Sequence, residues 1–175
     1  MSDDSVIFKI VVAGDQGVGK TTLIHKFVDG VFKGDTLSTI GVDFSLKTVI
    51  ASDKSYVLQI WDVAGEERFR AILPHYIPGT EAVVLAFDST RPFTLENLEE
   101  WIKVIEKAAD KPGMRFILIS TKNDLKPFNN AEKIKQFRSA HPEVIGYLPV
   151  SSKTGQNVEQ AFQMLGSAIL KKYGL

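Results

Sequence analysis

The sequence contains no cysteine, and its 175 residues carry no net charge, with 21 lysines and arginines against 21 aspartates and glutamates. The lack of cysteine excludes a disulfide, a thiolate metal site and a catalytic thiol. The charge balance gives no indication of a nucleic-acid partner. No apolar run approaches the roughly 18 residues of a membrane-spanning helix. Together these absences predict a cytoplasmic protein with no membrane anchor in this chain.

The rest of the composition is that of an ordinary globular protein. Hydrophobic residues make up 44% and charged residues 24% of the chain, as is usual for soluble domains. A length of 175 residues predicts one domain, 1–175, with a substantial core, and we expect a monomer. The first residues, Met1–Asp4, are acidic and polar and do not resemble a signal peptide, and Ser2 stands where N-myristoylation needs glycine.

The most informative segment is Gly14–Thr22, which fits the phosphate-binding pattern G-x-x-x-x-G-K-[ST]. The apolar run 7–13 predicts a buried strand before it, and helical spacing of apolar residues predicts a helix after it. Such a loop directs backbone N–H groups and the helix dipole toward one anion. Lys20 then reaches the β- and γ-phosphates, and the Thr21 hydroxyl binds Mg²⁺. The alternative is a plain tight turn. The residues expected to bind the nucleotide here are Asp15, Gln16, Gly17, Val18, Gly19, Lys20, Thr21 and Thr22.

Strand and helix patterns alternate along the rest of the chain. Two alternating runs, 41–50 and 55–61, are joined by a short polar link and predict an antiparallel hairpin. Continuous apolar runs at 82–87 and 116–119 predict central parallel strands covered on both faces. This alternation predicts a three-layer α/β fold with a mostly parallel sheet. Further expected elements are a strand at 146–149 and helices over 94–110, 131–140 and 158–172.

An aspartate and a glycine follow the run 55–61. Asp62, at the carboxyl end of a strand beside the phosphate loop, is expected to hold Mg²⁺ through water. Gly65 leaves its N–H free to approach a γ-phosphate, although this spacing also fits an ordinary exit from a strand into a turn. Thr39 is expected to complete the Mg²⁺ shell from a loop that the γ-phosphate orders. The expected metal ligands are Thr21, Thr39 and Asp62.

Two further polar segments predict a site for the base. Thr121-Lys122-Asn123-Asp124 directly follows the run 116–119. Guanine presents adjacent N1–H and N2–H₂ donors that one carboxylate can accept together, so Asp124 is expected to read guanine with the Lys122 stem along the base. Ser151, Ser152 and Lys153 are expected to offer a backbone N–H to the guanine carbonyl. Taken alone, each segment also fits a polar loop. The predicted base site contains Thr121, Lys122, Asp124, Ser151, Ser152 and Lys153.

In this order and spacing, the segments resemble the Ras superfamily of small GTPases over about residues 6–172. The runs Ile40–Phe44, Leu58–Asp62 and Glu67–Arg70 resemble the Rab branch. The resemblance implies a P-loop GTPase fold with a six-stranded, mostly parallel sheet, one antiparallel edge strand and about five helices. It also implies binding of GTP or GDP with Mg²⁺, hydrolysis of GTP to GDP and phosphate, and a molecular switch in vesicle trafficking.

The same resemblance implies surfaces for the base and for partner proteins. Phe32 falls where the family stacks an aromatic ring on guanine. Phe44, Trp61 and Tyr76 fall on the aromatic triad that Rab proteins present to effectors, although aromatic clusters in general belong more often to a core. Exchange factors, GTPase-activating proteins and effectors are therefore the expected partners, through the switch regions.

Glu66 stands where the family has its catalytic glutamine. An ionised glutamate only accepts hydrogen bonds and brings negative charge toward the γ-phosphate, so slow intrinsic hydrolysis is expected. Alternatively, Glu66 acts as a general base with a raised pKa, or it pairs with Arg68 or Arg70. Gln16, in the phosphate loop, either substitutes for the missing amide or obstructs an arginine finger. The candidate catalytic residues are Glu66, Lys20, Gly65 and Gln16.

Three other positions depart from the family. Thr36 replaces the tyrosine with which Rab proteins commonly cover the nucleotide, so a looser first switch is expected. Thr121 replaces asparagine, as also happens in the related Rho branch, and guanine selectivity is expected to survive. The C-terminus lacks the prenylated cysteines of Rab proteins, so either the chain has no lipid anchor or a tail was removed.

Two other functions remain open. A GTP-binding interaction module with little or no turnover is favoured by Glu66, Gln16 and Thr36. A nucleoside monophosphate kinase would need an acceptor-nucleotide site and an arginine-rich lid, and no segment of the chain remains for them.

Overall fold

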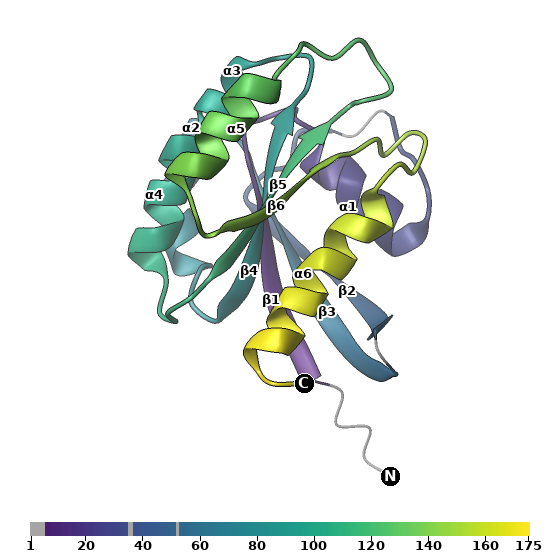
Figure 1. Ribbon diagram of the computed structural model, residues 1–175, viewed down its shortest axis with the longest axis vertical. Helices are drawn as coiled ribbons and strands as arrows, with labels where there is room; N and C mark the ends of the chain where they lie inside the picture. The colour runs from purple at the N-terminus through teal and green to yellow at the C-terminus, as the bar shows by residue number, and fades with distance from the viewer. Residues whose placement is uncertain (1–5, 35–36, 52) are drawn as a thin grey trace.

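Six strands form one mixed sheet with helices on both faces (Figure 1). The computed structural model describes residues 6–34, 37–51 and 53–175. The strands are β1 (Val6–Ala13), β2 (Val42–Ala51), β3 (Lys54–Val63), β4 (Thr80–Asp88), β5 (Arg115–Thr121) and β6 (Val144–Pro149). The helices are α1 (Lys20–Asp29), α2 (Glu67–Arg70), the 3₁₀ helix η1 (Leu73–His75), α3 (Phe93–Glu96), α4 (Leu98–Ala108), α5 (Ala131–Ala140) and α6 (Val158–Lys172). This confirms the three-layer α/β expectation.

The strand order is β2-β3-β1-β4-β5-β6. Strand β2 is antiparallel to β3, and every other pair is parallel, which confirms the predicted antiparallel edge strand. In the sheet, β1 lies between β3 on one side and β4 on the other, so the strand order reverses at β1. Ligands bind beyond the carboxyl ends of parallel strands where the strand order reverses in this way, and the loop after β1 lies at this point.

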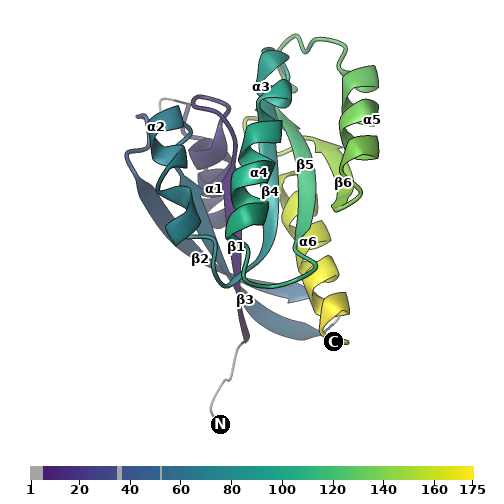
Figure 2. The same cartoon turned by 90° about the vertical axis from the view of Figure 1, so that its left-hand side faces the viewer.

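Each face of the sheet has its own hydrophobic cluster. Helices α1 and α6 pack on one face, where the rings of Phe27 and Phe162 stack at 3.9 Å between centroids. Helices α4 and α5 pack on the other (Figure 2), where Trp101 is fully buried. Every residue of β4 between them is buried. Among the described residues, no helix is both long and apolar enough to cross a membrane.

Most predicted elements are confirmed, and two regions differ. The helix expected over 94–110 is divided into α3 and α4 at Asn97, and if these count as one, the described residues contain the five expected α-helices. The second region, α2 and η1, was not predicted. Helix α2 has only four residues and none of them is buried, so it carries no apolar periodicity that could indicate a helix.

A buried carboxylate fastens the end of α6 to the sheet. Glu81 in β4 is 5% exposed and forms an ion pair with Lys111. From the end of α6, Lys172 Nζ lies 3.3 Å from Glu81 Oε2, and the Tyr173 hydroxyl donates to Oε1 over 2.8 Å. The Tyr173 ring also stacks on Phe8 at 5.9 Å. The last helix is thus held by polar as well as apolar contacts.

Candidate nucleotide-binding site

Close backbone packing requires glycine at two positions of the site. Gly14 has φ +150°, and a Cβ there would lie 2.2 Å from the carbonyl oxygen of Ala86 in β4. A Cβ on Gly65, after β3, would lie 2.3 Å from the backbone nitrogen of Gln16. The Gly65 backbone therefore lies directly against the phosphate loop.

Lys20, the first residue of α1, lies inside the loop. Its ammonium donates hydrogen bonds of 2.8 Å to the carbonyls of Gly14 and Asp15. The side chain is nearly enclosed, and burial lowers the pKa of Lys20 to about 8, an effect that the nearby carboxylate of Asp62 opposes. A cation held in a ring of backbone groups at a helix N-terminus suits a phosphate ligand.

The three predicted metal ligands lie together. Thr21 Oγ1 lies 2.7 Å from Thr39 Oγ1 and donates to Asp62 Oδ2 over 2.5 Å. Burial raises the pKa of Asp62, against the opposing effect of the Thr21 hydrogen bond. Its other oxygen, Oδ1, is buried without a hydrogen-bond partner in the described chain. These hard oxygen donors fit Mg²⁺, which takes few protein ligands and keeps waters and phosphate oxygens. In the described part of the chain, no three histidine, aspartate or glutamate side chains gather into another metal site.

Two adjoining cavities, both lined by Gly19, follow the loop. The larger, of about 300 Å³, is lined by Gly19, Thr22, Phe32, Gly34, Thr121, Lys122, Asp124, Leu125, Ser152 and Lys153. The smaller, of about 90 Å³, is lined by Gln16, Gly17, Gly19, Lys20, Thr21, Leu37, Ser38, Thr39 and Gly65. Most of the predicted base-binding residues thus line the larger cavity. Five residues of the predicted phosphate loop line the smaller one: Gln16, Gly17, Gly19, Lys20 and Thr21. Asp15 and Val18 line neither cavity.

Buried side chains hold the base cavity in shape. Ser151 does not line the cavity: it is fully buried, and its hydroxyl donates to Asp124 Oδ1 over 2.7 Å. The Thr121 side chain is also buried, with its hydroxyl 2.5 Å from the carbonyl oxygen of Val18 and 3.1 Å from that of Phe87. Thr121 therefore fastens the phosphate loop to the sheet, and Val18 contributes its buried backbone rather than an exposed surface.

The side chains of Glu66 and Gln16 each have a partner in the described chain, Glu66 in the helix that follows it and Gln16 in a neighbouring loop. Glu66 Oε2 forms an ion pair with Arg68 Nε at 2.7 Å, one of the arrangements that the sequence left open. The Gln16 side chain donates to Ser38 Oγ over 3.3 Å, so it contacts the loop that carries Thr39. Thr36, on which the expectation of a looser switch rests, lies outside the described residues.

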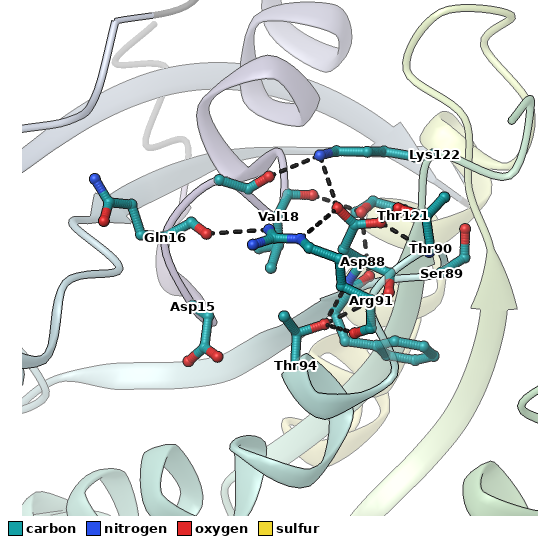
Figure 3. Close-up of polar contacts among 12 residues, drawn as sticks. Asp15, Gln16, Val18, Asp88, Ser89, Thr90, Arg91, Thr94, Thr121 and Lys122 are labelled. Carbon is teal, nitrogen blue, oxygen red and sulfur yellow. Dashed lines mark hydrogen bonds and ion pairs between the residues drawn. The ribbon is translucent and has the colours of Figure 1, made fainter. Parts of the chain in front are cut away.

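Sequence reasoning missed four residues around the phosphate loop: Asp88, Arg91, Asn97 and Trp101. Asp15 turns its carboxylate toward α4, where it accepts 2.6 Å and 2.9 Å hydrogen bonds from Asn97 and Trp101. Arg91 donates to the carbonyl oxygen of Gln16, and its guanidinium also pairs with Asp88 (Figure 3). Asp88 gave a usable signal, since it is a charged residue that directly follows the apolar run 82–87. Nothing in the sequence pattern distinguishes Asn97, Trp101 and Arg91 from ordinary helix and loop residues.

The aromatic triad also forms on the surface. The centroids of Phe44 and Trp61 are 5.2 Å apart, and those of Trp61 and Tyr76 are 5.7 Å apart. Lys9 Nζ lies 4.7 Å from the centre of the Trp61 ring. Phe44 is 49% exposed, and Trp61 and Tyr76 are partly exposed, so the trio presents an accessible apolar surface.

The strand order, with a phosphate loop at the reversal point, defines a P-loop GTPase fold. The family model for the Ras family matches residues 9–171, and the chain belongs to that family. It is 36% identical to Ras-related protein Rab-13 of Canis lupus familiaris over 96% of this chain and 82% of the relative. Ras-related protein Rab-1A of Dictyostelium discoideum is 36% identical over 95% of this chain and 82% of its own length, and Ras-related protein Rab-8B of Bos taurus is 37% identical over 95% and 80%. Within the Ras superfamily, the chain is a Rab-like small GTPase.

Proposed function

We propose that this protein is a GTP/GDP-controlled switch that hydrolyses GTP slowly and acts as a monomer. The observation that carries the proposal is the pair of adjoining cavities, with Asp124 in one and the group of Lys20, Thr21 and Thr39 in the other. A guanine ring and a chain of phosphates match these two chemistries in the same order.

Each side chain then has a definite task. Asp124, held by Ser151, accepts the two adjacent donors of guanine, and Phe32 stacks on the base. Lys20 and the loop N–H groups stabilise the phosphate charge, and Gly65 senses the γ-phosphate. Thr21, Thr39 and Asp62 would hold Mg²⁺, which supplies charge neutralisation at the phosphate oxygens.

The slow rate follows from Glu66. Its carboxylate cannot donate a hydrogen bond to an attacking water or to a phosphate oxygen while it is ionised. Pairing with Arg68 directs the carboxylate toward that guanidinium. A GTP-binding interaction module with little turnover stays as the second candidate, because a Glu66 carboxylate that is paired with Arg68 does not orient an attacking water.

The surface formed by Phe44, Trp61 and Tyr76 is proposed to receive effector proteins. Three clustered aromatic rings with an exposed edge are typical of a binding hot spot. Exchange factors and activating proteins would act on the neighbouring segments that carry Thr39 and Gly65.

Nucleotide binding tests the proposal directly. Nucleotide released by denaturing the purified protein is identified by chromatography, and affinities for GDP and ADP are compared by displacement of a fluorescent guanine nucleotide. We expect GDP to bind at least about 100-fold more tightly than ADP, because adenine lacks the adjacent pair of donors that the Asp124 carboxylate would accept from guanine. Equal affinity would contradict the proposal and favour a kinase. Single-turnover hydrolysis then separates the two candidates, since the interaction module retains GTP.

A further inference from the structure

Arg91 bridges a buried carboxylate and the phosphate loop. Its Nε donates to Asp88 Oδ2 over 3.0 Å, and its Nη2 donates to the carbonyl oxygen of Gln16 over 3.1 Å. Figure 3 shows the guanidinium between these two acceptors. Two different N–H groups of one rigid plane are used, and a single ammonium group cannot reproduce that geometry.

Asp88 is built to hold this arrangement. The carboxylate is 1% exposed and also accepts from the backbone and hydroxyl of Thr90 at 2.9 Å and 2.6 Å. Lys122 Nζ lies 2.7 Å from the same oxygen that binds Arg91 and donates to the carbonyl oxygen of Gly17 over 2.8 Å. Burial alone would raise the pKa of Asp88, but the hydrogen bonds from Lys122, Thr90 and Arg91 lower it. One ionised carboxylate thus positions two cations on consecutive carbonyls of the loop.

The direction of a peptide plane explains why the Gln16 carbonyl matters. The described chain contains no cis peptide bond, and in a trans peptide the C=O of one residue and the N–H of the next point in opposite directions. Arg91 holds the Gln16 carbonyl, so the N–H of Gly17 is directed away from Arg91. Gln16 and Gly17 both line the phosphate cavity. A cationic donor on the carbonyl also polarises the amide and strengthens its N–H as a donor.

We propose that Arg91 is a positioning residue for the nucleotide phosphates: fixed by Asp88, it orients and polarises the Gln16–Gly17 peptide so that the Gly17 N–H donates to a bound phosphate. This inference rests on the proposed function, because it requires a phosphate in the cavity. It assigns Arg91 an effect through the backbone rather than contact with the ligand.

Two simpler roles give different outcomes. If Arg91 acts only as a nearby positive charge, lysine should replace it fully. If Arg91 only stabilises the turn after β4, its loss should lower the free energy of unfolding without altering the environment of a bound phosphate.

The experiment compares Arg91→Ala and Arg91→Lys with the wild type. Lys103→Ala is the matched control, because it removes the exposed ion pair of Lys103 with Glu100 on α4. Release of a fluorescent GDP is measured by displacement with excess GDP. The ³¹P chemical shift of the β-phosphate of bound GDP reports the hydrogen bonds it accepts. Chemical denaturation reports stability.

We expect Arg91→Ala to release GDP about 10-fold faster, the size of a lost charge-assisted hydrogen bond, and to shift the β-phosphate resonance. Arg91→Lys should behave like Arg91→Ala, and Lys103→Ala like the wild type. Wild-type behaviour of Arg91→Lys would overturn the positioning role, as would an unchanged release rate and resonance in Arg91→Ala. Failure of the wild type to bind GDP would instead refute the proposed function.

Discussion

Trp101 donates its indole N–H to Asp15 Oδ1 over 2.9 Å, which joins a fully buried core residue of α4 to the phosphate loop. The other oxygen of Asp15 accepts from Asn97 at the junction of α3 and α4. The loop is therefore supported from outside through a side chain as well as through its backbone carbonyls.

Trp101→Phe should reduce both stability and nucleotide retention. The substitution leaves Asp15 Oδ1 without its donor and removes ring volume from the core, at a cost of about 1–3 kcal/mol in the free energy of unfolding. Denaturant titration measures this cost, and fluorescent GDP release measures retention. Trp61→Phe is the matched control, because the Trp61 indole N–H donates to the side chain of Gln59 and not, among the described residues, to the phosphate loop. Equal effects of the two substitutions would contradict a specific role for Asp15.

Glu66→Gln should accelerate single-turnover GTP hydrolysis. Glutamine can donate as well as accept hydrogen bonds, and it removes negative charge from the neighbourhood of the γ-phosphate. We expect a gain of up to about 100-fold, the scale of one well-placed transition-state interaction. Arg68→Ala separates the two effects, because it breaks the ion pair while keeping the carboxylate. No gain in Glu66→Gln would contradict the explanation for slow turnover.

Ser151→Ala should weaken guanine binding selectively. The change removes the 2.7 Å hydrogen bond that orients Asp124, so the affinity for GDP should fall about 10-fold while the weak affinity for ADP stays constant. Calorimetric titration measures both values. Ser139→Ala, which removes an exposed hydroxyl bonded to the backbone of α5, is the control. A parallel loss for both nucleotides would assign Ser151 to general stability.

Glu81→Gln should loosen the end of α6. The neutral amide no longer attracts Lys111 and Lys172, and the loss should be about 1–3 kcal/mol in the free energy of unfolding. Amide exchange at the end of α6 should accelerate while exchange in β1 stays slow. Glu96→Gln, at an exposed pair with Lys133, should change stability by less than about 1 kcal/mol. Unchanged exchange in Glu81→Gln would show that apolar packing alone holds the helix.

His141 should make stability depend on pH. Its two ring nitrogens lie 2.8 Å from Glu99 and 3.0 Å from Glu143. Burial alone would lower the pKa of His141, but the two carboxylates outweigh it and raise the pKa above 6.5. The contribution is therefore complete below pH 6.5 and is lost as the pH rises through the higher folded-state pKa. Denaturation of the wild type and of His141→Gln across this range should show the difference between them shrinking with rising pH. A constant difference would contradict the linkage.

Periodicity and motif spacing were sufficient for most of the fold. Helices over 131–140 and 158–172 match the observed bounds, because long amphipathic segments carry a clear apolar period. Helix α2 has no buried residue to generate such a period. Most residues that line the two cavities could be named in advance, because phosphate and guanine would demand particular side chains at fixed spacing.

The residues behind that surface were not predictable in the same way. Arg91 and Trp101 act through hydrogen bonds to parts of the chain 75 and 86 residues away. Such contacts depend on how separate elements meet in space. A single sequence carries no spacing rule for them.

The position of β2 at the edge of the sheet has a mechanical consequence. Among the strands of the described chain, β2 pairs only with β3, and the segment carrying Thr39 leads directly into it. A rearrangement there breaks hydrogen bonds along one side of one strand, whereas the same movement in β1 would break two ladders and disturb both hydrophobic clusters. A movement of the edge strand β2 and of the segment with Thr39 would therefore break fewer hydrogen bonds than a movement of the central strands, next to which Lys20 and Asp124 lie.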